Sequence, residues 1–353
     1  MIDVPLSVLD LSPVAAGTSA GRALRQTTEL ARRAEELGYH QFWVTEHHNV
    51  PAIASSAPAV LLAHLAAATS TIRVGSGGVM LPNHAPLVVA EQFGTLEALH
   101  PGRVDLGIGR APGTDQLTAL ALRRTTEGLS AEAFPEELAD LISLFTGEDE
   151  RWPILAMPGR GDMPAIWLLG SSGFSAQLAG LLGLPFSFAH HFSAANTEPA
   201  LALYRENFRP SRWLDRPYAM VAVTAICADT DERAQWLSGP AALSFVQLRS
   251  GRPQPLATPG GGGGLPVLRA RPGDGPAAVR RPGHRLPGHR PPAAGEPPGT
   301  HRRRRADAHH AGLRHRRPHP LPGAGRREGG GRPAPPAELT RADPSWAAAP
   351  GVT

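Results

Sequence analysis

The chain has 353 residues and a formal net charge of +4, but this total averages two unlike parts that meet between Pro259 and Gly260. Residues 1–259 hold 18 Arg against 25 acids, a charge of −7, which argues against nucleic acid as their partner; residues 260–353 hold 17 Arg against 6 acids, a charge of +11. The lone Cys227 excludes an intramolecular disulfide, and no secretory signal or membrane-spanning apolar run is visible, so we expect a cytoplasmic protein without a membrane partner.

Short β-like runs alternate with helical patterns through the first part, which predicts βαβ units and a parallel sheet. The expected strands cover residues 5–10, 41–45, 72–79, 104–108, 165–169, 186–189 and 218–228. The expected helices cover residues 23–37, 58–68, 87–99, 135–145, 175–182 and 231–237, with Asp229 or Thr230 capping the last one. No G-x-G-x-x-G turn follows the first strand, which disfavours a dinucleotide-binding open sheet. We therefore predict a (β/α)8 TIM barrel that lacks its eighth strand and last helix.

Polar residues end the second expected strand, where functional groups of a barrel gather. Glu46, His47 and His48 follow an apolar run, and an acid beside imidazoles can supply a base that titrates near neutral pH. Any one of these histidines could instead be a hydrogen-bonded core residue. For the whole cluster we favour function, because polar groups at a strand end are costly to bury.

The third expected strand ends in glycines and leads into a stiff loop. Gly77 and Gly78 leave room for a flat ligand against the backbone, although a bulge or a barrel corner explains them equally well. Met80 could simply fill the core. Asn83 and His84, which lie between two prolines, could present hydrogen-bond donors to a ligand.

The fourth and fifth expected strands end in residues suited to a phosphate. Arg110 could bind an anion, or it could pair with carboxylates of the following loop. Small residues with hydroxyls and free N–H groups open the next helix and could cradle a phosphate, although ordinary N-capping by one of the serines needs no ligand. These small residues are Ser171, Ser172, Gly173 and Ser175.

Four stretches of the sequence resemble the bacterial luciferase-like flavin-dependent monooxygenases. They are LSVLDLSPV, LARRAEELGYHQFWVTEHHN, IRVGSGGVMLPNHAPLVVAEQFGTLEALHPGRVDLGIGRAPG and WLLGSSGFSAQLAGLLGLPFSFAHHF, in that order. The resemblance covers roughly residues 5–259 and is strongest to single-component-type members of unknown substrate.

The resemblance implies a barrel that binds reduced FMN or, in some relatives, a reduced deazaflavin. It implies that His47 is the active-site histidine and that a cis peptide joins Gly77 to Gly78 beneath the flavin ring. We place Glu46, Met80, Asn83 and Gly173 with the cofactor-binding residues. The resemblance assigns Arg110, Ser171, Ser172 and Ser175 to the flavin phosphate.

The implied reaction is oxidation of a small organic substrate with reduced FMN and oxygen, with a separate flavin reductase and a homodimer as expected partners. A deazaflavin-dependent hydride transfer is the alternative within enzymes. The protein's share would be to exclude water, orient the flavin and hold proton-transfer groups.

The basic part, residues 260–353, has no Ile, Phe, Tyr, Met, Asn or Gln, and we expect it to be low-complexity and disordered. A nucleic-acid arm is one interpretation, but Trp346 is its only aromatic residue. A frame shift near Gly260 explains the composition better. Read one base out of register, GGGGGLPVL permits EEAAAYPYS, and the run from Ala306 permits PMLTTPVYDIADRIRSLELVAEKVG. The chain would then be an impaired or inactive relative of the enzyme.

Overall fold

Seven parallel strands form one sheet, and their order in the sheet is their order in the chain. The computed structural model describes residues 4–111, 115–123, 133–148 and 153–259, so the expectations for residues 260–353 lie outside the described part. The strands are β1 (Ser7–Asp10), β2 (Gln41–Val44), β3 (Arg73–Met80), β4 (Val104–Gly109), β5 (Ala165–Gly170), β6 (Phe186–Ala189) and β7 (Ala219–Ala222).

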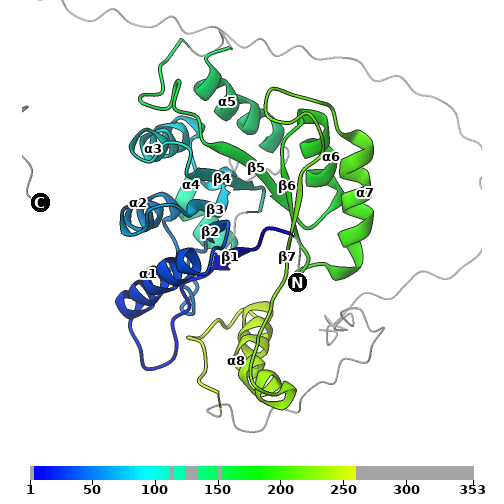
Figure 1. Ribbon diagram of the computed structural model, residues 1–353. Coiled ribbons are helices and arrows are strands. Elements are labelled where there is room, and N and C mark those ends of the chain that lie inside the picture. The colour runs from blue at the N-terminus through cyan, green and yellow to red at the C-terminus, as the bar shows by residue number, and fades with distance from the viewer. Residues whose placement is uncertain (1–3, 112–114, 124–132, 149–152, 260–353) are drawn as a thin grey trace, which may run out of the picture. The chain divides into compact units, whose positions relative to one another are not determined.

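Helices follow the strands and surround them, as Figure 1 shows for α1 to α3 beside β1 to β4 and for α6 and α7 beside β5 and β6. The helices are α1 (Ala20–Glu36), α2 (Pro58–Ala68), α3 (Pro86–Leu99), α4 (Gln116–Arg123), α5 (Phe134–Thr146), α6 (Gly173–Leu182), α7 (Thr197–Asn207) and α8 (Asp231–Arg249). Short 3-10 turns cover Leu81–Asn83 and Ala194–Asn196. This nearly closed barrel with alternating helices confirms the predicted TIM-type architecture.

All seven predicted strands and all six predicted helices are present, with four differences from the prediction. Helix α4 lies in the long stretch after β4 and was not predicted. Helix α7 was not predicted; it buries Ala200 and Tyr204 on one face, and the Tyr204 hydroxyl donates to the carbonyl of Leu184 at 2.9 Å. Strand β7 is shorter than predicted, because pairing with β6 ends at Ala222. Helix α8 is longer, because it continues through Pro240 instead of ending before it.

The two faces of β4 show how the barrel divides its interior from its outer core. Val104, Leu106 and Ile108 are fully buried in the apolar cluster that the helices cover. The alternate residues, among them Asp105 and Gly107, therefore point into the barrel. The apolar core thus lies between the strands and the helices, and the barrel interior is left for polar groups, glycines and a few aromatic rings.

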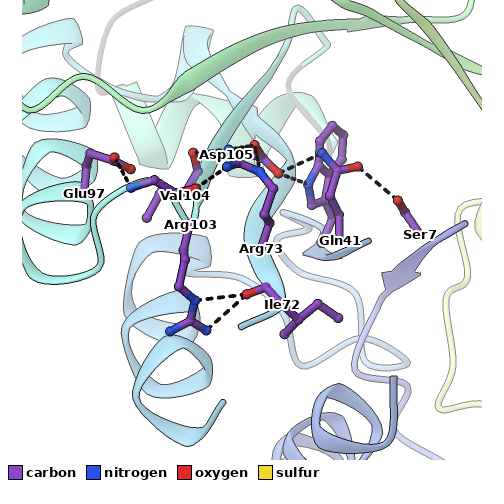
Figure 2. Close-up of polar contacts among 10 residues, drawn as sticks. Ser7, Gln41, Ile72, Arg73, Glu97, Arg103, Val104 and Asp105 are labelled. Atoms are coloured by element: carbon purple, nitrogen blue, oxygen red, sulfur yellow. Dashed lines mark hydrogen bonds and ion pairs between the residues drawn. The ribbon is translucent and has the colours of Figure 1, made fainter. Parts of the chain in front are cut away.

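Near the amino ends of the strands, the buried carboxylate of Asp105 on β4 binds polar side chains from β2 and β3, as Figure 2 shows. Gln41 on β2 donates to Asp105 Oδ2 at 2.9 Å, and the Arg73 guanidinium on β3 donates to Oδ1 through Nε at 3.1 Å. Ser7 on β1 donates to Gln41 Oε1 at 3.0 Å and so extends the network to a fourth strand. Each of these hydrogen bonds can form only when the strands are aligned in this register. The network therefore stabilises the register of β1 to β4.

Within the described residues, no helix combines the length and the apolar composition needed to cross a membrane.

Candidate active site

The Glu46 carboxylate, at the end of β2, holds the ends of two strands together. Its side chain is fully buried. It accepts hydrogen bonds from His48 Nε2 at 2.9 Å, from Asn83 Nδ2 at 3.0 Å and from His84 Nε2 at 2.9 Å. It also accepts the backbone N–H of Met80 at 2.9 Å. Residues predicted separately after the second and third strands therefore form one cluster.

These contacts decide the charge of the cluster. Burial, the largest influence, raises the pKa of Glu46, but the hydrogen bonds from His48 and His84, the charge of His84 and the Met80 N–H together lower it from 4.5 to about 2. Glu46 is therefore ionised at neutral pH, and it can orient donors but cannot give up a proton there. Within the described part of the chain, no group of three or more His, Cys, Asp or Glu side chains could hold a metal ion.

His47 is the next residue, and its hydrogen bonds go to Thr45 and Ser55 rather than to this carboxylate. Its Nδ1 lies 3.1 Å from the Thr45 hydroxyl, and its backbone N–H donates to the carbonyl of Ser55 at 3.0 Å. Burial lowers the pKa of His47, Glu46 opposes this effect, and His48 adds to it. The imidazole is thus held mainly neutral at neutral pH, the form that can accept a proton.

The peptide bond between Gly77 and Gly78 is cis, as the resemblance implied. The register of β3 against β4 also shifts between Gly77 and Val79, so the bulge considered from the sequence is present too. A Cβ on Gly77 would lie 2.5 Å from Leu9 Cδ1, and one on Gly78 would lie 2.7 Å from the carbonyl oxygen of Gly107. Packing alone therefore requires glycine at position 78, where the obstacle is the backbone of β4, whereas at position 77 the nearest atom is the end of the Leu9 side chain, which can move.

Met80 is the last residue of β3 and pairs with Gly109, the last residue of β4. Its backbone N–H is bound by Glu46, and its sulfur would lie 2.8 Å from a Cβ built on Gly109. The side chain is partly exposed, so Met80 does not simply fill the core. It brings the Glu46 cluster next to the end of β4, where Arg110 follows.

Arg110 contacts the first turn of α6. Its guanidinium carbon lies 4.5 Å from the centre of the Phe174 ring, a cation–π contact between the end of β4 and the helix after β5. Phe174 is 42% exposed and was not predicted as a site residue. Its signal in the sequence is an aromatic side chain directly after three small residues at a helix start. Residues 112–114 of the loop after Arg110 lie outside the described part of the chain.

The serines before α6 do not cap it through their side chains. Ser172 is the N-cap residue with extended backbone, but its hydroxyl makes no capping hydrogen bond. Ser171 and Ser172 are partly exposed, and Ser175 is 3% exposed beside Gly170. The ordinary capping considered from the sequence is therefore not formed, and the N–H groups of the first turn of α6 receive no side-chain oxygen from the cap.

The structure brings the predicted residues into two groups at the carboxyl ends of neighbouring strands. The first group joins Glu46, Met80 and Asn83 with His48 and His84. The second group joins the Arg110 side chain to the start of α6, the helix that Ser171 to Ser175 open.

A sequence model of one protein family, luciferase-like monooxygenase, matches residues 4–259. The chain belongs to this family. It is therefore an oxidoreductase of the monooxygenase type by family, and the match ends at the residue where the composition of the chain changes.

Two curated relatives are similar to the same part of the chain, and one of them is named a luciferase-like monooxygenase. The chain is 59% identical over 258 residues to the uncharacterized protein YvbT of Bacillus subtilis, a match that covers 73% of this chain and 76% of that protein. It is 50% identical over 256 residues to a luciferase-like monooxygenase of Escherichia coli K12, covering 72% and 76%.

Solved structures agree with the fold. The crystal structure of apo-MsnO8 is similar with a TM-score of 0.69 and 39% identity, covering 73% of this chain and 77% of that one. The oxygenating constituent of a 3,6-diketocamphane monooxygenase from Pseudomonas putida, solved in complex with FMN, shares the fold with a TM-score of 0.56 and 22% identity, covering 70% and 76%.

Proposed function

We propose that the chain's barrel binds reduced FMN at the carboxyl ends of β2 to β5 and uses oxygen to oxidise a small organic substrate. The observation that carries the proposal is the start of α6, where the side chain of the cap residue Ser172 makes no capping hydrogen bond and Arg110 lies against Phe174 of the first turn. A phosphate is the ligand that such a pairing of cation and helix N-terminus suits best.

The donors at this place fit a flavin phosphate. Arg110 supplies a permanent charge, the helix supplies N–H groups, and the hydroxyls of Ser171, Ser172 and Ser175 lie in the same short turn. We assign these four residues, with Gly173, to the phosphate end of the cofactor.

The Glu46 cluster and the two glycines would face the other end of the cofactor. Bound FMN would supply the activation of oxygen, which no side chain provides. The protein would orient the ring against the backbone at Gly77 and Gly78 and keep Met80 and Asn83 in place through the Glu46 carboxylate. His47, held mainly neutral, would accept or return a proton at its imidazole nitrogen.

The test is a comparison of FMN with riboflavin, which has the same ring and no phosphate. We expect FMN to bind at least tenfold more tightly, and Arg110→Ala to remove most of that difference without changing riboflavin binding. Arg233→Ala is the matched control, because Arg233 also lies over an aromatic ring, at 4.0 Å from Trp236, but on α8. Equal binding of FMN and riboflavin by the unmodified chain would count against the phosphate site.

A second measurement separates the possible reactions. With FMN, NADH and an added flavin reductase, we expect oxygen uptake that increases with aldehyde, ketone, thioether or amine substrates. Reduction of a deazaflavin without oxygen uptake would instead indicate hydride transfer. Flavin binding without either activity would indicate an inactive relative.

A further inference from the structure

Three aromatic rings form a continuous line from the barrel interior to the surface. The rings of Trp43 on β2 and Trp167 on β5 lie 5.3 Å apart, centre to centre, with an angle of 80° between their planes. The ring of Tyr218, directly before β7, lies 5.4 Å from that of Trp167. Both separations are typical of aromatic rings in contact. Two ring contacts therefore connect Trp43 with Tyr218.

The two tryptophans of this line lie apart from the apolar core. Both are buried, at 3% and 4% exposure. Among the described residues, the apolar cluster between strands and helices contains the chain neighbours of both but neither tryptophan. These neighbours are Phe42, Val44, Ile166 and Leu168. Because alternate residues of a strand point to opposite faces, both indoles face the barrel interior.

The inner end of the line borders the glycines of β3. A Cβ on Gly77 would lie 3.1 Å from Trp43 Cε3, and one on Gly75 would lie 2.6 Å from Trp43 Nε1. The indole therefore lies along β3 with its six-membered ring beside Gly77. The flavin ring is proposed to lie against the backbone at this glycine, which makes Trp43 the first ring of the line that an oxidant at the flavin would meet.

The outer end of the line reaches the surface. Tyr218 is 44% exposed, whereas Tyr204 is fully buried and Tyr39 is partly buried. With residues 213–217, Tyr218 lines a hollow of about 440 Å³. Its backbone N–H donates to the Tyr204 hydroxyl at 3.1 Å, which holds its main chain in place. A tyrosine that loses an electron also releases its phenolic proton, and water can take that proton at an exposed ring.

The polar neighbour of Trp43 favours the loss of an electron from its ring. The indole N–H donates to the buried carboxylate of Asp105, and the Arg73 guanidinium binds the other oxygen of the same carboxylate. A negative charge in a buried place stabilises a positive charge on the ring that it contacts. Trp43 is thus suited to be the ring that is oxidised first.

We propose that Trp43, Trp167 and Tyr218 form an electron relay that protects the active site from oxidants that do not reach a substrate. A one-electron oxidant formed from flavin and oxygen would take one electron from Trp43. Trp167 would return an electron to Trp43, and Tyr218 would return one to Trp167 and release its phenolic proton to water. A soluble thiol would then give one hydrogen atom to Tyr218 and restore it. The relay rests on the proposed flavin site for its starting point.

The test uses light, which makes bound oxidised FMN a one-electron oxidant without any substrate. The full chain with bound FMN is illuminated in the presence of a nitroso spin trap, which attaches to tyrosyl radicals, and the label on Tyr218 is measured by peptide mass spectrometry. We expect roughly tenfold less label in Trp167→Phe, because phenylalanine keeps a ring but is not oxidised by the flavin. Trp213→Phe is the matched control and should leave the label unchanged, since Trp213 lines the same hollow as Tyr218 but is not one of the three rings.

A second measurement follows the radicals by transient absorption after a light flash. We expect the absorption of the indole radical to decay as that of the tyrosyl radical rises. In Tyr218→Phe the indole radical should last roughly tenfold longer, because the last donor of the line is removed. This variant loses only a hydroxyl from an exposed ring and keeps the backbone hydrogen bond to Tyr204, so we expect it to fold.

The outcomes separate the relay from the proposed function. If the three rings only pack together, the variants will change the midpoint of urea unfolding but neither the label nor the radical lifetime. Equal label in the parent chain and Trp167→Phe with FMN bound, or an unchanged radical lifetime in Tyr218→Phe, would overturn the relay and leave the proposed function in place. Failure of FMN to bind to the parent chain, measured on the same samples, would contradict the proposed function and remove the starting point of the relay with it.

Discussion

The indole Nε1 of Trp43 on β2 donates a 3.0 Å hydrogen bond to Oδ2 of Asp105 on β4, and the bond passes across the strand between them. This is possible because Gly75 of β3 stands in register with both residues and has no side chain. A Cβ on Gly75 would lie 2.6 Å from Trp43 Nε1 and 2.6 Å from Asp105 Cβ. One glycine thus allows two strands that are not neighbours to bind each other inside the barrel.

We expect Gly75→Ala to destabilise the fold by about 2–4 kcal/mol, because the methyl group must displace the indole or the carboxylate and break their bond. Gly21→Ala is the control: it lies in α1, where the added methyl meets only the end of the Arg25 side chain at 3.6 Å. That change should be neutral or slightly stabilising. Urea unfolding of both variants measures the difference, and similar midpoints would contradict the explanation.

Asp105→Ala should cost about 3–5 kcal/mol of unfolding free energy, because it leaves the buried donors of Gln41 and Trp43 and the partly buried guanidinium of Arg73 without their shared acceptor. Asp229→Ala, at an exposed position before α8, should change stability by less than about 0.5 kcal/mol. The comparison uses chemical unfolding at pH 7. A small effect of Asp105→Ala would mean that water replaces the lost oxygen.

Because of Glu46, the free energy of unfolding should decrease as the pH falls from 4.5 to about 2. Its pKa is about 2 in the folded chain against an ordinary 4.5, so its contribution is fully present above pH 4.5 and is lost as the pH falls through about 2. The difference corresponds to about 3 kcal/mol. In Glu46→Gln this contribution is absent at every pH. The difference in unfolding free energy between the parent chain and this variant should therefore become smaller as the pH falls from 4.5 to about 2. A difference that stays constant over this range would contradict the lowered pKa of Glu46.

If His47 carries protons in the reaction, His47→Gln should lower turnover by about 10²–10⁴-fold while FMN affinity changes little. His40→Gln is the matched control, since His40 is exposed and uses only its backbone N–H, bound to the carbonyl of Leu6. Steady-state rates and FMN titrations on the same samples separate the two quantities. Loss of FMN binding together with turnover would indicate a binding role for His47.

The strands, most helices and the parallel architecture could be predicted because they follow local patterns of apolar residues. Helix α7 was missed because its buried face amounts to only two residues, Ala200 and Tyr204. The end of β7 was misplaced because its apolar run continues to residue 228 while its pairing partner ends at Ala189. A strand's length is set by its neighbour, which the run itself does not contain.

The candidate site was predicted as separate polar residues at strand ends, and their partners were not. His84 reaches Glu46 across 38 positions of sequence, and Phe174 meets Arg110 from a different strand–helix unit. Ser172 was considered as a helix cap because of its residue type, but its side chain makes no capping hydrogen bond. Side-chain partners of this kind depend on how the loops are placed in space, and local sequence patterns do not predict that placement.

By itself the sequence determined the alternation of strands and helices, the glycines at the third strand and the change of composition at Pro259. These are local properties, because periodicity and residue size act over a few positions. Only the tertiary structure decided that Glu46 binds both His48 and His84, that Trp43 reaches Asp105 across Gly75, and that the described barrel ends in two unpaired edges. Each of these depends on which strands become neighbours, and that is settled by packing of the whole chain.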